Sequence, residues 1–113
     1  MIKTSGIVEP LREILVGAKE IELALVFGSL ATGTETADSD IDLMIVVTIS
    51  PRKVSDLLAD LPQRLGREIN PVVMTPDEFA SRRRKKDHFL STVLSAPRLM
   101  VVGTDDDLTR LGT

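Results

Sequence analysis

The hydrophobic pattern of the chain switches between continuous apolar runs and apolar residues repeated at helical spacing. Runs at Leu23–Phe27 and Ile41–Val47 predict two strands that are buried on both faces. From Pro51 to Gly66, valine and leucine recur at helical spacing, which predicts a helix that Pro62 kinks or splits. The first half of the chain therefore contains two core strands and a helix able to cover them.

The remaining segments continue this alternation. A helix with Pro10 in an early turn, ending near Gly17, precedes the first strand. A third strand is expected over Glu68–Met74, where Pro71 favours an edge position, and a fourth over Leu99–Val102. Later helices are expected after the capping box at residues 75–78, over residues 88–95 and after residue 104. This order predicts an α/β or α+β fold, with helices packed on a small sheet.

Composition narrows the class of protein. The 113 residues suffice for one domain, and we expect a single domain over residues 1–113. Aromatic residues make up 3%, so the core must be aliphatic, and the absence of cysteine excludes disulfides and thiolate metal sites. No apolar run is long enough to span a membrane and no signal-peptide pattern is present, so a cytoplasmic location is expected. A net charge of −3 argues against nonspecific binding to nucleic acid.

The two predicted core strands have chemically distinctive ends. The first ends in Gly28-Ser29, and the second begins with Asp40 and Asp42, which project from the same face because strand side chains alternate. Two carboxylates form a hard-oxygen site suited to Mg²⁺, which shares its coordination with substrate phosphates. Gly28 permits close backbone approach, and amides over residues 30–32 would form an anion cradle if a short helix begins there. The pattern indicates nucleotide chemistry.

These residues resemble the minimal nucleotidyltransferases of the DNA polymerase beta superfamily. The resemblance rests on Gly28-Ser29, Gly33 and Ser39 through Leu43, together with the order of elements, and it covers about residues 8–74. It implies a mixed sheet and transfer of a nucleoside monophosphate from a nucleoside triphosphate, with ATP the expected substrate, to an acceptor hydroxyl. It further implies that Asp40 and Asp42 are catalytic and hold Mg²⁺ or Mn²⁺, and that Gly28, Ser29, Gly33 and Ser39 bind the nucleotide.

The chain departs from the family pattern at a third acidic position. Active relatives carry a third carboxylate on the strand after the second helix, where this chain has Asn70. An amide brings no negative charge and cannot act as a base. Glu68, two residues earlier on the same strand, is the alternative third ligand, although it also fits an exposed strand end.

Two other charged segments have simpler interpretations. Asp105–Asp107 repeats the Asp-x-Asp spacing but follows Thr104 at an expected helix start, where acidic residues cap the helix. The basic run Arg82–Lys86 is expected on a helix, where consecutive residues point in all directions, so it is interpreted as solvated surface. Binding of nucleic acid is its weaker alternative. Among apolar residues outside the strands, Phe79 and Phe89 are expected in the core.

Two functional classes stay open. The first is an active nucleotidyltransferase. The second is a catalytically weak or inert nucleotide-binding or interaction module, suggested by Asn70, that acts with a partner protein or a DNA-binding regulator. Minimal relatives often work beside a separate helical protein in toxin–antitoxin pairs, so the resemblance implies a protein partner, with a homodimer as the alternative.

Overall fold

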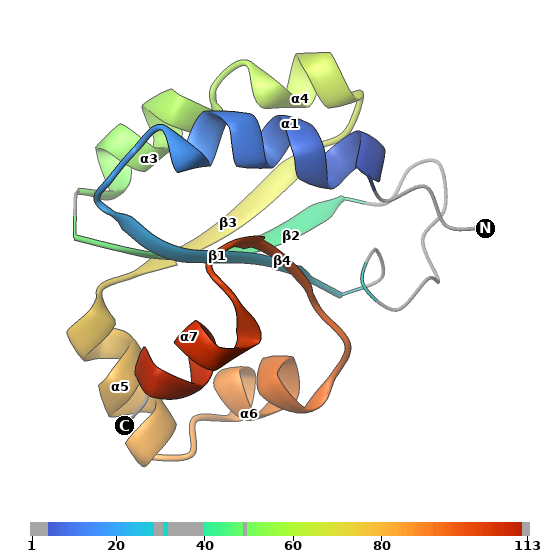
Figure 1. Cartoon of the computed structure of the whole chain (residues 1–113). Coiled ribbons are helices and arrows are strands. Elements are labelled where there is room, and N and C mark those ends of the chain that lie inside the picture. Colours follow the sequence, from blue (N-terminus) through green and yellow to red (C-terminus); the bar gives the residue numbers. More distant parts are fainter. Residues whose placement is uncertain (1–4, 29–30, 32–39, 49, 112–113) are drawn as a thin grey trace.

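The computed structural model describes residues 5–28, 31, 40–48 and 50–111. Its elements follow the predicted order (Figure 1). They are α1 (Ser5–Val16), β1 (Ile21–Phe27), β2 (Ile41–Val47), α3 (Pro51–Leu58), α4 (Leu61–Leu65), β3 (Ile69–Met74), α5 (Pro76–Arg84), α6 (His88–Ser95), β4 (Leu99–Val102) and α7 (Asp105–Leu111).

The four strands form one mixed sheet in the order β3-β2-β1-β4. β1 pairs antiparallel with β2 and with β4, whereas β2 pairs parallel with β3. β3 is an edge strand, as Pro71 predicted, because proline cannot donate a hydrogen bond to a further strand. β1 begins at Ile21, two residues earlier than expected, because Ile21 pairs with Val47 across a register shift. The mixed sheet confirms the predicted α/β (α+β) class.

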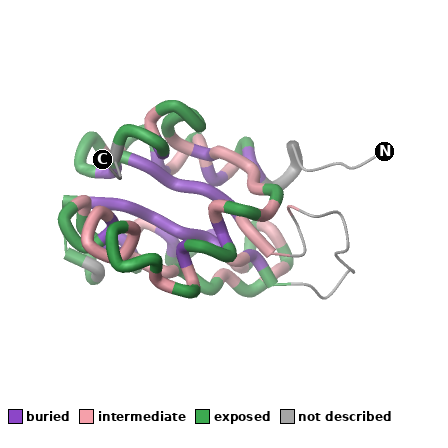
Figure 2. The backbone as a smooth tube through the Cα atoms, turned by 90° about the horizontal axis from the view of Figure 1, so that it is seen from below, coloured by how far each residue is buried: buried purple, intermediate pink, exposed green. Residues whose placement is uncertain are grey.

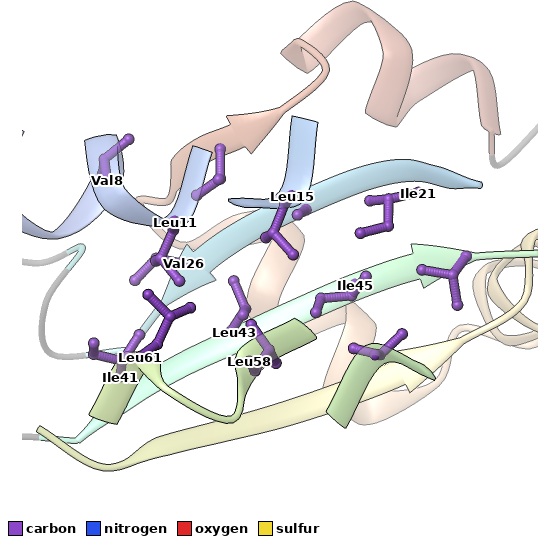
Figure 3. Close-up of a cluster of buried hydrophobic side chains, with 14 residues drawn as sticks. Val8, Leu11, Leu15, Ile21, Val26, Ile41, Leu43, Ile45, Leu58 and Leu61 are labelled. Carbon is purple, nitrogen blue, oxygen red and sulfur yellow. The ribbon is translucent and has the colours of Figure 1, made fainter. Parts of the chain in front are cut away.

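Helices cover both faces of the sheet, and Figure 1 shows α1, α3 and α4 on one side and α5, α6 and α7 on the other. Alternate side chains of β2 enter the two layers: Leu43 and Ile45 pack with the α1 side, and Met44 and Val46 with the α5 side. Figure 3 shows the first layer, where Leu11 from α1 lies beside Val26 of β1, and Leu43 and Ile45 of β2 continue the same layer. The two central strands are purple along most of their length in Figure 2, as their apolar runs predicted.

Local capping explains where several helices begin and end. The predicted long helix is split: α3 ends at Leu58, and α4 begins at Leu61 with Pro62 in its first turn. Gly66 ends α4 in the left-handed conformation, with φ of 68°. At the other end of the chain, the Thr104 hydroxyl accepts a hydrogen bond from the Asp107 amide, and the Asp107 carboxylate accepts one from the Thr104 amide. This reciprocal capping box confirms the predicted start of α7.

The basic run is not entirely helical, which corrects the prediction. α5 ends at Arg84, Lys86 has a positive φ of 56°, and Asp87 then caps α6 by accepting a hydrogen bond from the Leu90 amide. The competing signal is Asp87, a favourable N-cap residue that starts a new helix. Across the part of the chain that the structure describes, no helix is long and apolar enough to cross a membrane.

Candidate active site

One end of the sheet carries a row of side chains from three adjacent strands. Phe27 of β1 is the register partner of Asp42 of β2, and Asp42 is in turn the partner of Asn70 of β3. Directly paired residues project from the same face of a sheet. Asp42 is two residues from Met44, which packs under the α5–α7 layer, so this row belongs to that face.

Asp40 joins the row from the residue position just before β2. Its side chain is exposed, and its Oδ2 accepts a hydrogen bond from Nδ2 of Asn70 at 3.2 Å. Asp42 is half-buried. The structure therefore brings Asp40, Asp42 and Asn70 together at one place, and it shows Asn70 serving as a hydrogen-bond donor to a carboxylate.

Gly28 lies directly against the Asp42 carboxylate. A Cβ built on Gly28 would lie 2.4 Å from Oδ2 of Asp42, and the residue has a φ of +79°, which side-chain-bearing residues rarely adopt. Its carbonyl oxygen accepts a hydrogen bond from the Ala31 amide at 3.1 Å, closing a tight turn after β1. A glycine at this position thus satisfies two requirements: the backbone conformation and the space for the carboxylate.

Part of the predicted site lies outside the described residues. Ser29, Gly33 and Ser39, predicted to bind nucleotide, belong to this part, as does most of the short helix expected over residues 30–32. Ala31 is described as helical, but its amide is already hydrogen-bonded to Gly28, so it is not a free donor for an anion cradle.

Among the described residues, no basic side chain pairs with the carboxylate of Asp40 or Asp42. Within residues 40–48 and the other described segments, neither carboxylate forms an ion pair, and no three acidic, histidine or cysteine side chains gather into a metal site. Glu68 is exposed just before β3, and its carbonyl oxygen accepts the Ile41 amide. Two carboxylates with an amide neighbour fit a hard cation such as Mg²⁺ with open positions for other oxygen ligands.

An aromatic pair forms a wall beside this site, which the sequence did not reveal. Phe27 and Phe89 of α6 meet edge to face, with ring centroids 5.4 Å apart and an interplanar angle of 82°. Both side chains are half-buried, whereas Phe79 is fully buried in the same layer, as expected. Phe89 was predicted as core, and it does pack against the core cluster while bordering the site.

Two arginines of the basic run Arg82–Lys86 form interactions within the protein. Arg82 pairs with Glu78, and Arg83 donates hydrogen bonds to the carbonyl oxygens of Leu108 and Thr109 in α7. Residues 84–86 and 88 are exposed. The run therefore helps to fasten α7 to α5, with its remaining cations on the surface as predicted.

A family model described as Polymerase beta, Nucleotidyltransferase matches residues 9–88 of the chain. No curated protein matches it.

Several solved structures share the fold. A toxin–antitoxin structure with AMP-PNP has a TM-score of 0.66 and 17% identity, covering 94% of this chain and 81% of that chain. A mutant of the toxin–antitoxin MntA–HpeT with two aspartate-to-glutamate substitutions has a TM-score of 0.67 and 17% identity, covering 93% of this chain and 80% of that chain. A tri-AMPylated Shewanella oneidensis HEPN toxin in complex with MNT antitoxin has a TM-score of 0.60 and 16% identity, covering 93% and 76%.

Proposed function

Because the chain belongs to the polymerase beta nucleotidyltransferase family, we propose that it is a minimal nucleotidyltransferase. It transfers a nucleoside monophosphate from a nucleoside triphosphate, ATP in the first instance, to an acceptor hydroxyl. The reaction depends on Mg²⁺ or Mn²⁺, and residues 1–113 act as a single catalytic domain in the cytoplasm. The observation that carries this proposal is the acidic pair Asp40 and Asp42, which forms no ion pair with a described residue and whose Asp42 lies against Gly28.

The proposed roles follow from position. Asp40 and Asp42 hold the cation, whose chemistry is to neutralise the phosphate charge and to orient the reacting oxygens. Gly28 leaves room for phosphate oxygens beside Asp42, and Ser29, Gly33 and Ser39 are proposed to complete the phosphate contacts. Asn70 orients the Asp40 carboxylate through its hydrogen bond. Glu68 remains an alternative third ligand.

The transfer replaces one phosphorus–oxygen bond by another. The acceptor oxygen forms a bond to the α-phosphorus, the bond from that phosphorus to the bridging oxygen breaks, and pyrophosphate leaves. The hydroxyl proton must go to a base. Asn70 cannot accept it, because an amide is not a base at neutral pH. In this proposal the proton passes to solvent water, or to a base that the acceptor molecule supplies. Positioning of the acceptor oxygen against the α-phosphate provides most of the rate acceleration.

A protein hydroxyl is the acceptor class that we propose. The support is the structural neighbour that contains a tri-AMPylated toxin beside an MNT antitoxin. By analogy, the partner of this chain is a separate protein, and a homodimer is the alternative.

The test uses ATP labelled at the α-phosphate, Mg²⁺ and an extract of cells that lack the native protein. Label should appear on a protein only with the native chain, not with an Asp40→Asn/Asp42→Asn variant. ATP labelled at the γ-phosphate should give no label that depends on the added native chain, because that phosphate leaves with pyrophosphate. Label from the γ-position that appears only when the native chain is added would indicate a kinase-type transfer and contradict the proposal.

The second candidate is an inert nucleotide-binding module that acts with a partner protein or a DNA-binding regulator. Asn70 favours it, because this residue occupies the register position beside Asp42 without bringing a third charge. This candidate predicts binding of ATP and Mg²⁺ with no transfer of the α-phosphate to any acceptor. Binding and transfer measured on the same preparation distinguish the two candidates.

A further inference from the structure

A small apolar pocket adjoins Gly28 on the face of the sheet that α6 covers. Its volume is about 140 Å³. It is lined by Phe27, Gly28, Phe89, Thr92, Val93 and Ala96. Of these six residues, only Thr92 has a polar side chain. Gly28 is therefore shared: it borders the pocket and also contacts the carboxylate of Asp42.

The size of the pocket limits what it can hold. A cavity of about 150 Å³ accommodates one benzene ring, whereas sites for whole drug-sized ligands have roughly 300–1,000 Å³. The pocket is thus suited to one flat ring system and is too small for a complete nucleotide. Its aromatic wall, formed by Phe27 and Phe89, offers ring surfaces to such a group.

We propose that this pocket receives the base of the nucleoside triphosphate. The inference rests on the proposed function, which places the phosphates at Gly28 and the acidic pair. A nucleotide held there can extend through its sugar past Gly28, so that the base enters the apolar pocket. This assignment uses the direct continuity between the pocket and the phosphate site, which share Gly28.

The lining also determines selectivity. Every base has a face that can contact an aromatic ring, so such contacts are tolerant of base identity. Readout of the base edge needs hydrogen-bonding groups, and among the lining side chains that the structure describes Thr92 alone offers one. The four common ribonucleoside triphosphates should therefore bind with affinities within about tenfold of one another.

The test compares two ligands by calorimetry in the presence of Mg²⁺: ATP and inorganic triphosphate, which lacks sugar and base. Thr92→Phe places a ring in the pocket from an exposed helical position, so the core is left intact. It should weaken ATP binding about tenfold or more, as expected for loss of base contacts, and leave triphosphate binding unchanged. Ser91→Phe is the matched control, because Ser91 is exposed on the same helix but does not line the pocket.

Several outcomes would overturn the assignment. The first is ATP binding to the native chain that is no tighter than triphosphate binding. The others concern Thr92→Phe: an unaffected ATP affinity, or equal losses of affinity for ATP and triphosphate. A loss of label transfer in Thr92→Phe with ATP affinity retained would assign the pocket to the acceptor. If triphosphate binding to the native chain depends on Asp42, these outcomes leave the proposed function standing. If the native chain binds neither ligand, the proposed function fails together with the pocket.

Discussion

Two Asp-x-Asp sequences in this chain have opposite electrostatic surroundings. At the start of α7, Asp105 pairs with Arg98, and Asp107 pairs with Arg110 and caps the helix. At the start of β2, Asp40 has only the neutral amide of Asn70 as its described hydrogen-bond donor. The first pair is satisfied by the protein itself, whereas the second has acceptor capacity left for a cation. The surroundings of two aspartates, and not their spacing, therefore indicate a ligand site.

The largest effect is expected from removing each pair of charges in turn. Mg²⁺ and ATP at about one hundred times the dissociation constant should stabilise the native chain by about 2.7 kcal/mol. Asp40→Asn/Asp42→Asn should abolish this stabilisation, because the cation ligands are lost. Asp105→Asn/Asp107→Asn should retain it while lowering the melting temperature of the free protein. Thermal unfolding with and without ligand measures the stability of each variant and its stabilisation by ligand. Stabilisation that is lost in Asp105→Asn/Asp107→Asn and retained in Asp40→Asn/Asp42→Asn would contradict the account.

The second prediction concerns two glycines that share a left-handed conformation. Gly28→Ala and Gly66→Ala should each cost about 1–2 kcal/mol of stability, because both residues have positive φ. A Cβ at Gly66 meets nothing within 4 Å, whereas one at Gly28 meets Oδ2 of Asp42. Only Gly28→Ala should therefore displace the carboxylate and weaken the binding of ATP with Mg²⁺. Equal ATP affinities in the two variants would show that this close contact is irrelevant to the ligand.

The third prediction concerns a variant that adds a third carboxylate at position 70. Asn70→Asp removes the hydrogen bond to Asp40 and adds a like charge, so the free protein should lose about 1 kcal/mol or less. The stabilisation produced by Mg²⁺ should increase, because a third carboxylate adds a ligand. The control Asn70→Ser loses the amide without adding charge and should show no increase. Weaker Mg²⁺ binding by Asn70→Asp than by the native chain would contradict the proposed position of the cation.

The smallest effect is on the dependence of stability on pH. The hydrogen bond from the Thr104 amide, with the Arg110 side chain, holds the pKa of Asp107 below its ordinary value. A lowered folded-state pKa means that the unfolded chain binds more protons, so this contribution is present above about pH 4 and is lost as pH falls further. Asp107→Asn should remove it. The free energies of unfolding of the native chain and of Asp107→Asn, measured between neutral and acidic pH, should converge as pH falls. A constant difference between them would argue against this contribution of Asp107.

The fold could be predicted largely because local signals agree with it. The apolar runs, the proline and glycine boundaries and the capping residues all specify the same order of elements, and Pro71 indicates the edge strand. The exception is the helical basic run, where the Asp87 cap competes with continuation of α5.

The sequence predicted which residues gather at this end of the sheet, including the distant Gly28 and Asn70, but not most of the contacts that they make. Asp40 and Asp42 are neighbours on one strand, so their common face follows from strand geometry. The wall formed by Phe89 depends on how α6 packs against the end of β1, which no local pattern encodes. The hydrogen bond from Asn70 likewise depends on the register of β3 against β2.

The most direct test of the central claim is calorimetric titration of ATP into the native chain, with Mg²⁺ and with the metal removed by a chelator. The same titration on Asp42→Asn completes the experiment. We predict binding that requires both Mg²⁺ and Asp42, because we propose that the acidic pair, which pairs with no described basic group, is the cation site. ATP binding that persists without Mg²⁺, or that is unchanged in Asp42→Asn, would contradict the account.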